Sequence, residues 1–269
     1  MRPALHAEWT KLRTVRGPLW LLLATVVATV ALSAGAVSVA ACGSAGCGDP
    51  TRLSLTGVRL GQAPVVVLAV LVMAAEYGTG MIGGTLTAMP RRITVLAAKA
   101  VTLAGIVAAA GTVAVLGSLT AGGVLLPGHT GTAATHGRPA PPPLSPSSSL
   151  SLLPSDGPTL RAALGSVLYL TLIALLGLGV ATVVRDSATG IGIVLGLLYL
   201  FPLLSQAIGD PHGQRLLQRI GPMSAGLAVQ ATTGLRSLPI GPWAGLGVTA
   251  GWAAAALLTG GLLLYVRDA

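Results

Sequence analysis

The sequence predicts an all-α integral membrane protein with six transmembrane helices, and three observations support that prediction. Of the 269 residues, 53% are hydrophobic and only 9% are charged, and the mean hydropathy is +0.81. A soluble domain carries about 25% charged residues, so this chain has too few charges to cover a surface in water. Six segments reach or approach the ~20 apolar residues that a bilayer-crossing helix needs. We therefore expect one six-span domain over residues 19–269, in a cell membrane.

The spans are predicted at residues 19–39, 61–82, 93–126, 164–184, 188–204 and 243–266. The second is short unless residues 77–82 prolong it, and the fifth is expected to kink or end near Pro202. Lys99 lies near the start of the third span, and its long side chain is expected to reach the nearer membrane interface.

Two G-xxx-G pairs stand within the last two spans. Gly192 pairs with Gly196, and Gly247 pairs with Gly251. Such pairs let helix backbones approach closely, and we expect them to pack within one bundle rather than at a dimer contact.

Basic residues beside the apolar runs set the predicted orientation. Six crossings place both termini on one side, and the N-terminal tail carries Arg2, Lys11, Arg13 and Arg16, which favours the cytoplasm. The density of basic residues favours this orientation, although their raw count alone does not decide it. The net charge of +9 is thereby explained without nucleic acid, since 3% aromatic residues offer no stacking platform for bases.

The N-terminal residues 1–18 are predicted to form a cytoplasmic interfacial helix. Leu5, Trp9 and Leu12 share one helical face, while Glu8 lies elsewhere around the helix. Trp9 would then lie at the depth of the headgroups. The alternative is a charged tail that only retains the terminus in the cytoplasm.

Two long segments are predicted on the outer side. Residues 127–159 are rich in Pro, Ser and Gly and are expected to form a disordered extracellular loop. Residues 205–241 have apolar positions at roughly helical spacing, which indicates a short interfacial helix and loop; a plain surface loop is the alternative.

The two cysteines, Cys42 and Cys47, follow the first apolar run in the stretch CGSAGC. If that side is outside the cell, a disulfide closing a small loop is favoured, and two free thiols are the alternative. The apolar run is longer than the core of a cleaved signal peptide, so we expect it to stay as the first span.

The spans hold no cluster of catalytic side chains, which argues against an enzyme. All four histidines lie outside them, and the ionisable residues Glu76, Lys99, Arg185 and Asp186 lie at the predicted cytoplasmic edge. A phosphate-binding G-xxxx-G-K-[ST] loop is absent, because neither lysine follows a glycine. If the chain transports a substrate, the energy must come from another subunit.

Residues 76–92, EYGTGMIGGTLTAMPRR, form the predicted cytoplasmic link between spans two and three. Their glycines permit tight turns, and their arginines can anchor the segment at anionic headgroups. We expect a short helix here to dock on a soluble motor; the alternative is an ordinary loop with basic residues. The candidate coupling residues are Glu76, Tyr77, Gly78, Thr79, Gly80, Arg91 and Arg92.

Three stretches resemble one family in their order along the chain. AEWTKLRTVRGPLW before the first span, EYGTGMIGGTLTAMPRRITVLAAKA between spans two and three, and RIGPMSAGLAV before the last span are similar to segments of actinobacterial permeases of the ATP-binding-cassette type-two exporter group. The resemblance implies a bacterial six-span half-transporter. It would pair with a second half, for which we expect a second copy of the chain (a homodimer) and a different chain is the alternative, and with two copies of a cytosolic ATPase that bind ATP and Mg²⁺.

In that family the region of Glu76 would be the coupling segment, and residues 2–16 would form the interfacial helix beside the ATPase. The Pro/Ser-rich loop departs from the family pattern, in which that link is short. The rival interpretation is a non-transporting membrane anchor or immunity-type protein that sequesters a ligand. Drug, lipid, peptide and polysaccharide substrates all remain open.

Overall fold

The computed structural model describes residues 16–39, 49–78, 92–125 and 156–267, and this part of the chain is helical without strands. The elements are α2 (Arg16–Val39), α3 (Pro50–Ser54), α4 (Val58–Gly78), α6 (Arg92–Leu125), α7 (Gly157–Val184), α8 (Ser187–Ala207), α9 (Pro211–Ile220), α10 (Pro222–Gly226), the 3₁₀ turns η2 (Leu227–Gln230) and η3 (Leu235–Ser237), and α11 (Pro242–Arg267). Six helical segments are long and apolar enough to cross a membrane, which confirms the predicted six-helix membrane architecture.

The second span is longer at its start than the sequence indicated. It begins at Pro50 and includes α3, a short turn and α4, which ends at Gly78 among the described residues. Asp49 caps α3 by accepting a hydrogen bond from the Arg52 amide at 3.1 Å, and proline suits the first helical turn. Charged residues in this first part interrupt the apolar window, which explains why the hydropathy pattern missed it.

The fourth span also starts earlier than predicted. α7 begins at Gly157, whereas the apolar run begins at residue 164. Arg161 lies in the added turns, and its guanidinium donates to the Ala231 carbonyl at 2.6 Å. The last residues of the predicted disordered range 127–159 therefore belong to a helix, and residues 127–155 lie outside the described residues. α8 continues through Pro202 to Ala207 without ending there.

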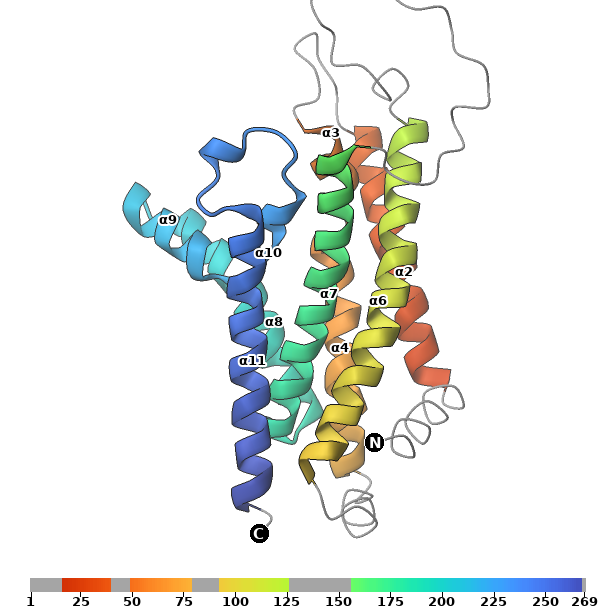
Figure 1. Ribbon diagram of the computed structural model, residues 1–269, viewed down its shortest axis with the longest axis vertical. Helices are drawn as coiled ribbons and strands as arrows, with labels where there is room; N and C mark the ends of the chain where they lie inside the picture. The colour runs from red at the N-terminus through yellow and green to blue at the C-terminus, as the bar shows by residue number, and fades with distance from the viewer. Residues whose placement is uncertain (1–15, 40–48, 79–91, 126–155, 268–269) are drawn as a thin grey trace, which may run out of the picture.

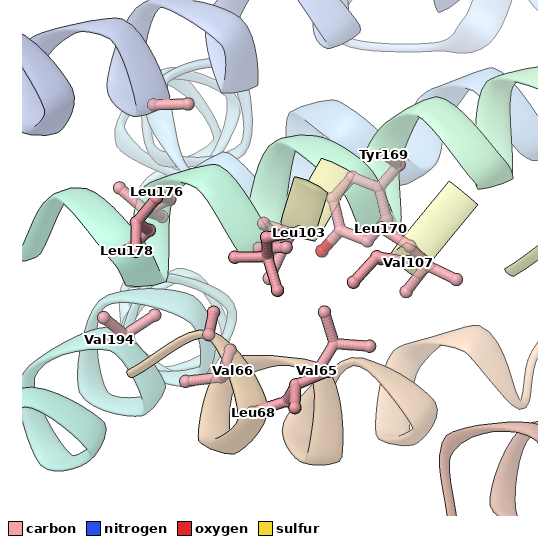
Figure 2. Close-up of a cluster of buried hydrophobic side chains, with 14 of the residues drawn as sticks. Val65, Val66, Leu68, Leu103, Val107, Tyr169, Leu170, Leu176, Leu178 and Val194 are labelled. Carbon is pink, nitrogen blue, oxygen red and sulfur yellow. The ribbon is translucent and has the colours of Figure 1, made fainter. Parts of the chain in front are cut away.

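α7 is the central helix of the bundle. Figure 1 shows it between α11 on one side and α4 and α6 on the other, and it contacts all three as well as α8. Its buried residues include Tyr169, Leu170, Leu176 and Leu178. Figure 2 shows side chains of α4 and α7 gathered with Leu103 of α6 in one apolar cluster.

Glycines allow several of these helices to touch backbone to backbone. A Cβ on Gly61 of α4 would lie 1.9 Å from the Thr29 hydroxyl of α2, and one on Gly179 of α7 would lie 2.6 Å from the Ala256 carbonyl carbon of α11. Lipid tails are as apolar as the helices, so close packing of this kind is what holds membrane helices together.

The predicted packing role of the two G-xxx-G pairs is wrong for this bundle. A Cβ on Gly192, Gly196, Gly247 or Gly251 would meet nothing within 4 Å. These glycines lie on outward faces of α8 and α11, because the packing faces of those helices are built from other residues. In a chain with 37 glycines, such spacing also arises by chance.

The chain between α8 and α11 is folded rather than a plain surface loop. α10 packs against α11 and α8, and η2 is buried between α7 and α11. A Cβ on Gly245 of α11 would lie 2.0 Å from the Ala225 carbonyl oxygen, and one on Gly226 would lie 2.5 Å from the Tyr169 ring. This segment is thereby packed against α11 and against Tyr169 of the central helix.

Candidate functional site

The bundle has two ends that carry different candidate sites. Figure 1 shows the end of α4, the start of α6, the α7–α8 turn and the end of α11 at its lower end, which we call the α7–α8 end. The opposite end carries α3 and η3, and we call it the α3 end. The first span, α2, starts on the side of the α7–α8 end, and the last span, α11, ends there.

The predicted coupling residues fall at the α7–α8 end or outside the described residues. Glu76, Tyr77 and Gly78 form the last turn of α4, and Arg92 is the first residue of α6. Among these, the structure describes only the Tyr77 side chain, which is half-buried. Thr79, Gly80 and Arg91 lie outside the described residues.

The other predicted site residues also lie outside the described part of the chain. These are Leu5, Glu8, Trp9 and Leu12 of the predicted interfacial helix, and Cys42 and Cys47 of the predicted disulfide.

Tyr77 contacts the turn between α7 and α8. The Arg185 guanidinium carbon lies 5.1 Å from the centre of the Tyr77 ring, which is a cation–π geometry. Arg185 caps α7 with φ of 62°, and its amide donates to the Ala181 carbonyl at 2.9 Å. A non-glycine residue in this left-handed conformation costs about 1–2 kcal/mol, so the turn carries some strain while it places the guanidinium over the ring.

Asp186 completes the same turn by capping α8. Its carboxylate accepts a hydrogen bond from the Thr189 amide at 2.7 Å. Hydrogen bonds from the Thr189 amide and side chain, and from the Ala188 and Ser187 amides, lower the pKa of this exposed carboxyl group despite slight desolvation. The turn therefore consists of two residues, each fixed to the helix it ends or begins.

Lys99 ties the other flank of segment 76–92 to α4. Its side chain is only 2% exposed, and Nζ donates to the Val72 carbonyl oxygen of α4 at 3.5 Å. The expectation that it reaches outward to the membrane interface is wrong, because α4 packs over it. A buried ammonium group is expensive to desolvate, so it is held only where polar partners surround it.

At the α3 end, one carboxylate joins the second span to the segment before the last. Asp49 accepts from the Thr232 amide and hydroxyl, both at 2.6 Å, and from the Thr233 amide at 3.1 Å. Partial burial raises the pKa of Asp49, but hydrogen bonds from Thr232, Arg52 and Thr233 outweigh that effect and lower it. The sequence gives no signal for the Thr232 contact, which spans 183 residues.

Neutral polar groups lie between the two ends. The Tyr169 hydroxyl of α7 donates to Gln62 Oε1 of α4, and Gln230 Nε2 of η2 donates to Ser166 Oγ of α7 at 3.1 Å. All four side chains are buried. They link α4, α7 and η2 through hydrogen bonds between uncharged groups.

Within the described residues, no group of three or more His, Cys, Asp or Glu side chains is placed to hold a metal ion. No protein-family model matches the chain, and a search of curated proteins finds no similar sequence.

Proposed function

We propose that this chain is the transmembrane permease subunit of an ATP-driven exporter of the ATP-binding-cassette type. In this proposal the α7–α8 end faces the cytoplasm, and segment 76–92 docks on a separate ATPase present in two copies. A second copy of the chain completes the transporter. The chain itself is not an enzyme, because ATP and Mg²⁺ bind to the partner.

The observation that carries this proposal is the attachment of both flanks of segment 76–92 to neighbouring helices. Tyr77 on the α4 side lies against Arg185 of the α7–α8 turn, and Lys99 on the α6 side donates to the α4 backbone. A push on the segment would therefore move the ends of α4 and α6 together with the turn that begins α8. Such a linkage can convert docking of a soluble subunit into movement of several spans.

Two features of the sequence support the same proposal. The chain has no phosphate-binding loop, so energy for transport would have to come from a partner. The resemblance of residues 7–20, 76–100 and 219–229 to type-two exporter permeases, in this order, supports that family and its mode of coupling.

Co-purification tests the proposal. The tagged chain is expressed with the cassette ATPase encoded in the adjacent reading frame and purified in mild detergent. We expect the ATPase to be retained by the wild type and by Arg236→Ala, a control at the α3 end. Glu76→Gln and Arg91→Ala combined with Arg92→Ala should reduce retention. Equal retention by all variants, or none by the wild type, would contradict coupling through this segment.

A second measurement separates transport from sequestration. In vivo, the biological effect of the wild-type pair should disappear when the partner ATPase can bind but not hydrolyse ATP. The membrane-anchor interpretation requires instead that the full effect persists with that inactive partner.

A further inference from the structure

α9 is an amphipathic helix with two exposed stripes side by side. Leu216 and Ile220 are 53% and 44% exposed, and Arg215 and Arg219 are also exposed. Residues four apart lie on the same face of a helix, so the leucine–isoleucine stripe runs next to the arginine stripe. None of the ten residues of α9 is buried, and Figure 1 shows the helix extending sideways from the bundle.

The helix ends are fixed, so this exposure belongs to a folded element. The Asp210 carboxylate accepts from the Gly213 amide at 2.8 Å, and the Gly221 amide donates to the Leu217 carbonyl at 2.9 Å. The Ile220 carbonyl accepts from the Trp252 indole nitrogen of α11 at 3.0 Å, which joins the end of α9 to the bundle.

The length of α8 places α9 close to one membrane surface. α8 has 21 residues, which at 1.5 Å per residue span about 31 Å, close to the thickness of the hydrocarbon core. α9 begins at Pro211, shortly after α8 ends at Ala207. A helix that starts there lies at the boundary between acyl chains and headgroups.

The apolar surface of the last turns of α8 continues onto α9. Leu203 is 62% exposed, and Leu204 and Ile208 are also exposed beside it. On α9 itself the exposed charges are basic, and the carboxylate of Asp210, just before the helix, is used for the cap. An apolar stripe beside a stripe of guanidinium groups matches the acyl and headgroup layers of an anionic membrane surface.

We infer that α9 and the last turns of α8 form a lipid-docking element. Leu216 and Ile220 enter the acyl boundary, and Arg215 binds the phosphate groups of anionic phospholipids. Arg219 is partly engaged by the protein, because its Nε donates to the Pro239 carbonyl at 2.7 Å. This inference does not depend on the exporter proposal, since it concerns the membrane surface at the other end of the bundle.

Site-specific fluorescence on the full-length protein tests the depth of α9. In a background with Cys42→Ser and Cys47→Ser, an environment-sensitive fluorophore is attached at Leu216→Cys. Thr233→Cys serves as the water-exposed reference, and Leu258→Cys on α11, which is 68% exposed, serves as the bilayer reference. Each protein is reconstituted in vesicles of equal phosphatidylcholine and phosphatidylglycerol and quenched with brominated lipids or aqueous iodide.

We expect the label at residue 216 to be quenched most by lipids brominated near the headgroup, and severalfold less by iodide than the label at residue 233. Iodide quenching equal to that at residue 233 would place α9 in water and overturn the inference. Protection from both quenchers would indicate a protein partner, such as a second copy of the chain, and would overturn it equally.

The same label measures the contribution of charge. Quenching by brominated phosphatidylglycerol relative to brominated phosphatidylcholine reports the local enrichment of anionic lipid. One arginine at a membrane surface contributes about a fivefold preference, equivalent to about 1 kcal/mol, so Arg215→Gln should lower the ratio by up to that factor. Arg215→Lys should retain it. An unchanged ratio in Arg215→Gln would contradict headgroup binding by this residue.

Discussion

Replacing Gly245 with alanine should separate α10 from α11. The added Cβ would lie 2.0 Å from the Ala225 carbonyl oxygen and 2.8 Å from the carbonyl carbon, so the backbone of one helix has to shift. Overpacking of this kind costs about 1–3 kcal/mol. The shift would also weaken the hydrogen bond from the Thr249 hydroxyl to the Pro222 carbonyl, now 3.0 Å long, which contributes about 1 kcal/mol.

Alanine also favours a helix over glycine by about 1 kcal/mol, which offsets part of this loss. The net destabilisation is therefore about 2 kcal/mol, or a fall of about 4–8 °C in the unfolding midpoint for a chain of this size. Tryptophan fluorescence during heating of the detergent-solubilised protein measures it, since Trp243 and Trp252 lie on α11.

Gly247→Ala is the matched control on the same helix. Its Cβ would meet nothing within 4 Å, so only the gain in helix propensity applies and the midpoint should stay or rise slightly. Equal midpoints for the Gly245→Ala and Gly247→Ala proteins would refute the close contact between α10 and α11.

Three further predictions concern Asp49, Tyr77 and the two cysteines. The folded-state pKa of Asp49 is lowered from 3.8, so its contribution to stability is present above that value and is lost as the pH falls through the lower folded-state pKa. The Asp49→Asn protein should therefore unfold at a lower temperature than the wild type at neutral pH, and the two unfolding temperatures should converge in acid. A difference in unfolding temperature that stays constant with pH would contradict this. Tyr77→Leu removes the ring beneath Arg185 and should weaken stimulation of the partner's ATP hydrolysis. Tyr77→Phe keeps the ring and should retain that stimulation. Equal loss of stimulation in both variants would exclude the cation–π contact as the cause. Thiol labelling of the intact, unreduced protein should fail at Cys42 and Cys47, and ready labelling would show that they are not bridged.

Hydropathy predicts the spans but not the parts of them that carry charge. The first, third, fifth and sixth helices follow the apolar runs closely. The second and fourth begin earlier, where Arg52 and Arg161 interrupt the run. Both arginines are accommodated near the end of the bundle, and Arg161 is paired with a backbone carbonyl. A window average cannot distinguish such a paired charge from the end of a span.

Contacts between distant segments are the part of the candidate site that the sequence could not supply. The order of the spans alone predicts that Glu76, Lys99 and Arg185 lie at one edge of the bundle. The stacking of Arg185 on Tyr77 depends on the left-handed conformation of Arg185 after α7. Glycine is the residue that usually indicates such a conformation in a sequence, so an arginine at this position does not predict it. The contact of Asp49 with Thr232 depends in the same way on where the chain before α11 returns.

The six spans differ in how much of their surface is buried inside the protein, and α8 is the least buried of them. It is joined to α7 by the two-residue turn at Arg185 and Asp186, and its outward glycines have no neighbour. The protein therefore covers less of α8 than of the other spans, and a tilt of this helix would be resisted mainly by its contacts with α4, α7 and α10. A bilayer that becomes thinner or thicker would act first on this helix, and the composition of the surrounding membrane would thereby set its angle.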